Sequence, residues 1–189
     1  ITPRNISETS ADIGILVKLD KAETAEVKAA ILDPHGNLET ELFGRTDKDR
    51  ITLSGKINCP KLWNGVNSPG LYRAEITLFC NGEPVDSIEQ EFGIRSYRID
   101  ADNGFFLNGK PYPLHGVNYH QDSYESGWAM TGAQRERDYR IIRDMGCTAV
   151  RMAHYQHCDH EYSLCDRLGL CVWTEIGIIN KMSADDSDA

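Results

Sequence analysis

The chain has 189 residues, of which 40% are hydrophobic and 26% charged, and 20 Lys and Arg against 29 Asp and Glu give it a net charge of −9. This acidic balance disfavours nucleic acid and anionic membrane surfaces as partners, because both attract basic proteins. The longest apolar runs, such as IGILV and LCVW, are far shorter than the roughly 20 residues of a membrane helix, so we expect a globular protein with a hydrophobic core.

The chain begins at Ile1 rather than at a Met, and no secretory leader opens it. We therefore expect an upstream portion of the protein, and any targeting signal with it, to lie outside this chain. The compartment stays open between the cytoplasm and the periplasm of a bacterium. None of the six cysteines forms a C-x-x-C pair, so we interpret most of them as buried free thiols and favour this over a zinc site or a disulfide framework.

The first half of the chain, from Ile13 to about Arg95, has the pattern of short strands separated by turns. Pro34 with Gly36, and Asn81 with Gly82, fit tight reversals. Apolar and polar residues alternate with a period of two, most clearly in 70–79, which indicates strands with one buried face. We expect about seven strands and a β-sandwich of immunoglobulin type, with strand segments at 13–19, 25–32, 38–43, 50–57, 70–79 and 85–94.

After Ser96 the pattern changes to strands alternating with helices. Strands are expected within 111–120, 148–155 and 170–176. Thr131 and Gln134 form a capping box before a helix whose buried face carries Tyr139, Ile142 and Met145, and Gly146 suits its end. Asp159 is expected to cap a second helix, which has Tyr162, Cys165 and Leu168 on one side and Gly169 at its end. This alternation predicts a parallel sheet with right-handed crossovers.

Ligands of parallel α/β folds bind where the strands end and the loops to the helices begin. The polar residues at the three expected strand ends are Asn118, Tyr119, His120, Arg151, His154, Tyr155 and Glu175. An arginine, two histidines and a carboxylate gathered at one face suit recognition of a polyhydroxylated ligand. Tyr124 and Trp128, in the long loop after the first strand, could stack on a sugar ring or pack that loop.

Each of these residues also has a structural interpretation. Arg151 could form a structural ion pair, with Glu175 as its partner, as readily as it could bind a ligand. His120 and His154 could be satisfied core or loop histidines, and Tyr155 could pack over the sheet. His157 and His160 form an H-x-x-H around Cys158, but we do not favour a metal site, because a helix start with a mixed polar surface explains them equally well.

Several segments resemble glycoside hydrolase family 2. NGKPYPLHGVNYHQDSYESGWAM, GCTAVRMAHYQH and LCDRLGLCVWTEI resemble the start of its catalytic barrel, while CPKLWNGVNSPGLYRAEITL and FGIRSYRID resemble its immunoglobulin-like domain and the link into the barrel. The resemblance implies an immunoglobulin-like β-sandwich at 1–97, followed at 98–189 by the N-terminal part of a truncated TIM (β/α)8 barrel. Within the family, the long loop after His120 and the LCDRLGL segment favour the β-galactosidase type.

The same resemblance implies roles for individual residues. His120, Arg151 and His154 would line the sugar subsite, with Arg151 orienting the nucleophilic carboxylate and the histidines contacting hydroxyls. Asn118, Tyr155 and Glu175 would support them. Thr148 and Gln156 replace the family's usual Asn and Pro at peripheral positions.

The resemblance also implies what this chain lacks. The family's two catalytic glutamates would lie on later strands, beyond Ala189, so we expect no catalytic residue in this chain and no activity from it alone. Some β-galactosidases hold magnesium with a Glu-x-His segment after the third strand, whereas this chain has IGIINKM. We therefore expect no cofactor and no metal ligand here, although magnesium elsewhere in the parent enzyme stays open.

The leading hypothesis is a parent enzyme that hydrolyses terminal β-galactosides with retention, with a carbohydrate substrate as partner and a homo-oligomer left open. A β-glucuronidase or β-mannosidase of the same family is the first alternative. A basic pocket for the carboxylate of a uronate would favour a β-glucuronidase, but the sequence has no additional Lys/Arg cluster near the three strand ends. A non-catalytic carbohydrate-binding or adhesion module is the second alternative, and it would leave the polar strand ends unexplained.

Overall fold

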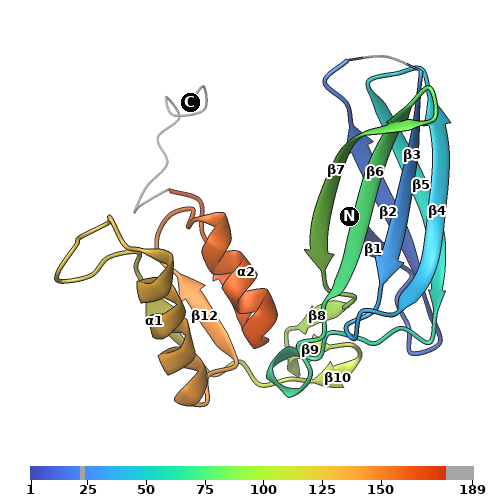
Figure 1. The fold of residues 1–189 in the computed structure, drawn as a ribbon. Coiled ribbons are helices and arrows are strands. Elements are labelled where there is room, and N and C mark those ends of the chain that lie inside the picture. Colours follow the sequence, from blue (N-terminus) through green and yellow to red (C-terminus); the bar gives the residue numbers. More distant parts are fainter. Residues whose placement is uncertain (22–23, 178–189) are drawn as a thin grey trace, which may run out of the picture. The chain divides into compact units, whose positions relative to one another are not determined.

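The computed structural model describes residues 1–21 and 24–177, which form two compact units (Figure 1). The first unit contains Ile1–Asn64, Gly70–Ile99 and Phe106–Lys110. The second contains Gly65–Pro69, Asp100–Phe105 and the described residues from Pro111 on. None of the helices in the described ranges is both long and apolar enough to cross a membrane.

The first unit is a β-sandwich of two antiparallel sheets. One sheet has the order β1-β2-β5, formed by β1 (Thr2–Arg4), β2 (Ser10–Lys18) and β5 (Arg50–Asn58). The other has the order β4-β3-β6-β7, formed by β4 (Leu38–Thr46), β3 (Ala25–Leu32), β6 (Tyr72–Cys80) and β7 (Glu83–Phe92). These seven strands confirm the predicted sandwich of immunoglobulin type.

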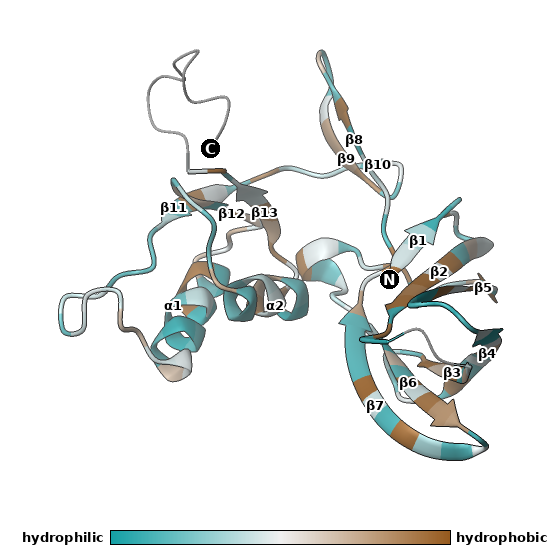
Figure 2. Ribbon diagram, turned by 90° about the horizontal axis from the view of Figure 1, so that it is seen from above, coloured by the Kyte–Doolittle hydropathy of each residue, from teal (hydrophilic) through white to brown (hydrophobic). Residues whose placement is uncertain are grey.

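Alternating burial along the strands builds the core of the sandwich. Ile13 and Ile15 of β2 and Val27, Ala29 and Ile31 of β3 are almost completely buried, while the residues between them are less so. The edge strand β7 differs, because all of it except Phe92 is exposed and most of it is hydrophilic (Figure 2). Its charged residues suit an edge, since charges oppose pairing with another chain.

The chain then forms a small sheet of order β10-β9-β8, from β8 (Tyr97–Asp100), β9 (Gly104–Leu107) and β10 (Lys110–Pro111). The second unit is built on three parallel strands in the order β11-β12-β13, namely β11 (Gly116–Tyr119), β12 (Ala149–Met152) and β13 (Cys171–Thr174). Helix α1 (Gly132–Asp144) connects β11 to β12, and α2 (Asp159–Leu168) connects β12 to β13. This order confirms the predicted start of a β/α barrel.

The helix ends show where local sequence signals held and where they failed. The capping box of Thr131 and Gln134 is present. Asp159 is not the cap of α2, because Cys158 takes that position without a side-chain bond and Asp159 begins the helix. Met145 is also not on the buried face, since α1 has already ended at Asp144, and the Met145 side chain is exposed.

The six cysteines differ in burial more than the sequence suggested. All six cysteines are free, but only Cys147 and Cys165 are buried, while Cys59 is exposed and the other three are half-buried. Burial raises the pKa of the Cys165 thiol well above its usual range. The prediction of mostly buried free thiols is therefore right about the thiols and only partly right about their burial.

The segment Gly65–Pro69 lies between strands of the sandwich in sequence but packs within the second unit. It contains a 3-10 turn, η1 (Gly65–Asn67). The backbone N–H of Val66 donates to the Tyr112 hydroxyl at 3.1 Å, and Arg143 of α1 donates to the Val66 carbonyl at 3.1 Å. Gly169 at the end of α2 meets the same turn so closely that a Cβ there would lie 2.4 Å from the carbonyl carbon and oxygen of Gly65.

This close approach generates a prediction about two glycines that end helices. Gly146 and Gly169 both have left-handed φ angles, of 84° and 78°, but a Cβ at Gly146 meets nothing within 4 Å. Gly146→Ala should therefore cost only the strain of roughly 1–2 kcal/mol. Gly169→Ala should cost a further 1–3 kcal/mol or so, because the backbone of Gly65 must move. Urea unfolding, with amide exchange of α2 as the local probe, measures both; equal losses would contradict the contact.

Candidate functional site

The parallel pairing of β11, β12 and β13 brings the ends of the three strands to one edge of the sheet. Asn118 is opposite Arg151, which is opposite Trp173. Because successive residues of a strand point to opposite faces, Asn118 and Arg151 share a face, and the neighbouring Tyr119 and Met152 point to the other. The register therefore sorts the polar strand ends into one group that faces the helices and one that does not.

Arg151 forms a bidentate ion pair with Glu175. Its Nε donates to Oε1 of Glu175 at 2.9 Å and its Nη2 donates to Oε2 at 3.0 Å. Its Nη1 donates to the side-chain oxygen of Asn118 at 3.2 Å. The side chains of Arg151 and Glu175 are 33% and 24% exposed, so the pair is partly shielded from solvent. The planar guanidinium matches a carboxylate in this geometry, and it links residues of β11 and β12 to Glu175, which directly follows β13.

His154 lies against this pair. Its Nδ1 is 2.9 Å from Nη2 of Arg151 and 3.2 Å from Oε2 of Glu175. A guanidinium can only donate, so the shorter contact makes Nδ1 an unprotonated acceptor, and the Glu175 oxygen is then a close neighbour of Nδ1 rather than a hydrogen-bond partner. A neutral ring then carries its proton on Nε2, and the side chain is about half exposed. In this tautomer His154 presents an N–H donor on the side of the ring that faces away from Arg151.

A series of ring contacts extends the cluster toward the loop after β11. His120 is 5.5 Å from His154 and 6.2 Å from Tyr155 between ring centroids. Trp128 stacks on Tyr155 at 5.3 Å, and the Tyr155 hydroxyl accepts from the backbone N–H of Gln121 at 3.3 Å. Trp128 thus has a packing role beside Tyr155 and still exposes 71% of its surface, whereas Tyr124 is fully exposed.

Tyr119 belongs to the opposite face of the sheet. Its hydroxyl donates to Asp138 of α1 at 3.2 Å, and its ring packs edge-on against Tyr139 at 4.9 Å. Burial, together with the nearby carboxylates of Glu161 and Asp138, raises the pKa of Tyr119 well above its usual range. Tyr119 therefore packs the helix layer, and the remaining predicted residues gather at the strand ends: Asn118, His120, Arg151, His154, Tyr155 and Glu175.

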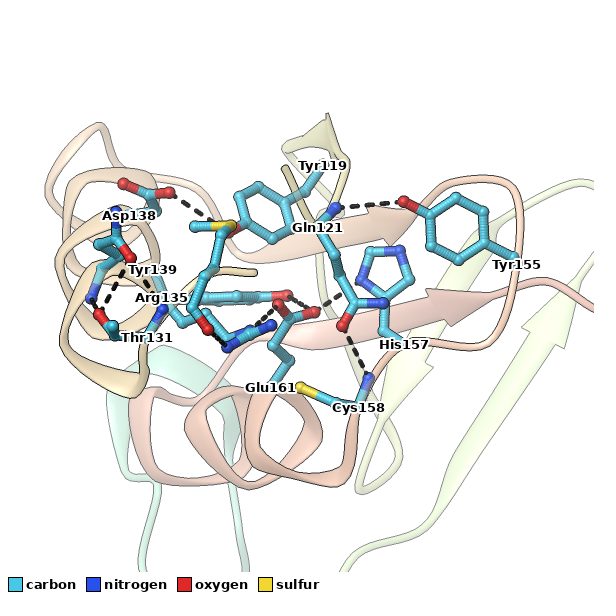
Figure 3. A network of polar contacts seen from close by, with 12 residues as sticks. Tyr119, Gln121, Thr131, Arg135, Asp138, Tyr139, Tyr155, His157, Cys158 and Glu161 are labelled. Atoms are coloured by element: carbon cyan, nitrogen blue, oxygen red, sulfur yellow. Dashed lines mark hydrogen bonds and ion pairs between the residues drawn. The ribbon is translucent and has the colours of Figure 1, made fainter. Parts of the chain in front are cut away.

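Behind the strand ends lies a buried polar network that the sequence analysis did not find (Figure 3). Glu161 of α2 is completely buried and contacts His157, with Oε2 at 2.7 Å from Nδ1. Arg135 donates from Nε to Oε1 of Glu161 at 3.0 Å, and the Tyr139 hydroxyl donates to Oε2 at 3.4 Å. A signal existed, because Glu161 precedes Leu164 and Cys165 at helical spacing on the buried face of α2.

The H-x-x-H pair does not converge on a common point in this network. His157 points to Glu161 and, through Nε2, to the Ala153 carbonyl at 3.3 Å. The Nε2 of His160 is buried without a hydrogen-bond partner. Within the described ranges, no three His, Cys, Asp or Glu side chains are grouped as metal ligands. Most of the segment that follows Glu175, on which the expectation about magnesium rests, lies outside the described residues.

Comparison with known proteins places both units in one family. A family described as "Glycosyl hydrolases family 2" matches residues 1–95, and one described as "Glycosyl hydrolases family 2, TIM barrel domain" matches residues 99–186. A β-glucuronidase of Bacteroides fragilis is 44% identical over 65% of this chain and 18% of its own length. A β-galactosidase of Bacteroides ovatus is 29% identical over 93% of this chain and 22% of its own.

A solved structure, the β-glucuronidase of Bacteroides uniformis, has a TM-score of 0.85 at 32% identity, over 99% of this chain and 24% of that one. The chain thus spans about a fifth to a quarter of the length of these relatives.

The ion pair generates a prediction about the 189-residue chain itself. A double-mutant cycle with Arg151→Ala and Glu175→Ala should give a coupling energy of about 1 kcal/mol, because both side chains are partly exposed. Urea unfolding of the four proteins measures it. A coupling above about 3 kcal/mol would be typical of a fully buried pair and would make Arg151 chiefly structural.

Proposed function

Because the chain belongs to glycosyl hydrolase family 2, we propose that it forms part of a retaining β-glycosidase that hydrolyses terminal β-D-galactosides. The observation that carries the proposal is the cluster at the strand ends, in which Arg151 hydrogen-bonds both Glu175 and His154 beside His120. Such a cluster offers several directed donors to a polyhydroxylated ring and one cation to a carboxylate.

In this proposal, His120, Arg151 and His154 line the sugar subsite. The Nε2–H of His154 donates to a sugar hydroxyl, and His120 stands beside it to contact a second one. Arg151 keeps a nucleophilic carboxylate, supplied by a later strand, ionised and aimed, while Asn118 and Glu175 fix the guanidinium and Tyr155 supports the histidines. Hydrogen bonds that strengthen as charge develops at the anomeric carbon lower the barrier more than they tighten substrate binding.

A neutral hexose suits this cluster better than a uronate does. Arg151 already pairs with Glu175 and, in this proposal, also faces the nucleophilic carboxylate, so little of its positive charge is left for a carboxylate of the substrate. A β-glucuronide is the second candidate, favoured by relatives that are named β-glucuronidases. A uronate would then need a cation from outside the residues described here.

The first test compares substrates. We expect the full-length enzyme to hydrolyse aryl β-galactosides with a kcat/KM at least about 10-fold above that for β-glucuronides and β-mannosides, with retention at the anomeric carbon. The 189-residue chain should show no turnover, because retention needs two carboxyl groups about 5–5.5 Å apart and the described strand ends offer only Glu175, which is paired with Arg151. A preference for β-glucuronides would support the second candidate, and turnover by the short chain that survives repurification would contradict the proposed division of roles.

The second test addresses Arg151 in the full-length enzyme. Arg151→Ala should lower kcat by about 100-fold or more, because it removes a charge that acts mainly in the transition state, while the melting temperature changes little. Arg140→Ala is the matched control, since Arg140 is exposed on α1 and pairs with Glu136 in an i,i+4 contact. Near-normal kcat per folded molecule together with a large loss of stability would show that Arg151 is a structural residue.

A further inference from the structure

Burial of the Glu161 side chain costs free energy, because a carboxylate loses its hydration in the protein interior. Its side chain has no exposed surface, and it shares the interior of the second unit with His157, whose side chain is equally buried. Arg135, only 15% exposed, completes a group of three charged or chargeable side chains. Such groups are often replaceable by apolar residues at no loss of stability. Stability alone is therefore a weak explanation for this group.

The hydrogen-bond partners indicate how the group is charged. The Nε2 of His157 faces the Ala153 carbonyl, which can only accept. Its Nδ1 faces the Glu161 carboxylate, which also accepts from Arg135 and Tyr139. Burial raises the pKa of Tyr139 well above its usual range, so this hydroxyl keeps its proton and donates. Both nitrogens of His157 can donate at once only if the ring carries two protons, as an imidazolium beside an ionised Glu161.

This pair connects the helices to the loop that carries the proposed site. Arg135 and Tyr139 come from α1 and Glu161 from α2, whereas His157 belongs to the connection between β12 and α2 (Figure 3). Through Nε2, His157 holds the carbonyl of Ala153, the residue that precedes His154. The position of the His154 backbone is therefore bound to the helix layer by one continuous series of hydrogen bonds.

His157 also packs against the aromatic side chains of the site. Tyr155 stacks on the His157 ring at 5.1 Å with an interplanar angle of 26°, and Trp128 stacks on Tyr155. Gln121 contributes a further connection, because its side-chain oxygen accepts from the backbone N–H of Cys158 at 3.0 Å while its own backbone donates to Tyr155. A shift of His157 would thus move Tyr155 and, with it, the ring contact between Tyr155 and His120.

We propose that His157 and Glu161 are positioning residues of the sugar site: their buried pair holds the 153–157 segment so that His154 and Tyr155 keep the geometry needed in the transition state. Neither residue touches the substrate in this arrangement. The inference rests on the proposed function, since it names the residues that set the geometry of the same site.

The first experiment uses the 189-residue chain and needs no activity. Nitrogen-15 NMR of the histidine side chains at pH 7 should show both ring nitrogens of His157 protonated, and His154 protonated on Nε2 alone. In Glu161→Gln, the signals of His154, Tyr155 and Trp128 should shift, whereas Glu136→Gln, at a half-exposed position of α1, should leave them unchanged. An unprotonated nitrogen in His157, or unshifted site signals in Glu161→Gln, would overturn the proposal.

The second experiment separates positioning from stability in the full-length enzyme. Glu161→Gln and His157→Gln should lower kcat by about 10- to 100-fold with a much smaller change in KM, because small displacements of aligned groups are costly mainly in the transition state. Glu161→Asp, which keeps the charge, should recover part of the loss. The triple variant Arg135→Met, His157→Leu, Glu161→Leu replaces the buried charges together, and we expect it to fold and to remain impaired.

The outcomes of the two experiments are distinct. Full activity in the folded triple variant, or kcat values that only follow the melting temperature across the series, would overturn the positioning role. A full-length enzyme that hydrolyses none of the glycosides would refute the proposed function, and the NMR measurements would still decide whether Glu161 and His157 set the geometry of His154 and Tyr155.

Discussion

The strand-end cluster depends on the hydrogen bonds of the Arg151 guanidinium. A parallel sheet aligns the backbones of its strands but leaves their terminal side chains free to diverge. Arg151 on β12 bonds to Asn118 on β11 and to Glu175 just after β13, so one planar group connects side chains at the ends of three strands. The same group selects the tautomer of His154, because a donor-only partner requires an acceptor nitrogen. Orientation and protonation in the cluster thus have a common cause.

Two polar pairs of the second unit differ in what surrounds them. Arg151 and Glu175 are partly exposed, so water and salt weaken their attraction and ligands can approach. Glu161 and His157 have no exposed side-chain surface, so their interaction is strong, directional and costly to leave incomplete. An exposed pair can respond to a substrate, whereas a buried one keeps its geometry. The second unit combines both, one at the edge of the sheet and one behind it.

Periodicity predicted much of this fold, since β3 was expected at 25–32 and is Ala25–Leu32, and the β/α order of the second half was also correct. The rule that parallel strands end at one edge predicted that Arg151 and Glu175 would meet. Helix ends were less predictable, because Asp159 satisfies the preference for a cap and for a first turn equally well. The contacts of Glu161 with Arg135 and Tyr139 could not be predicted from the sequence. These two residues lie on another helix, and a local sequence pattern carries no information about contacts between helices.

The placement of Gly65–Pro69 bears on how such proteins can be divided and recombined. This segment is encoded among the strands of the sandwich, yet its turn provides the acceptor for Arg143 and the donor for the Tyr112 hydroxyl. A polypeptide that begins after the sandwich and contains only the β/α part of the sequence would lack both groups. It would also lack the backbone of Gly65, against which Gly169 packs closely. Exchange of sandwich domains between relatives therefore preserves the barrel only if this one turn is exchanged as part of the barrel.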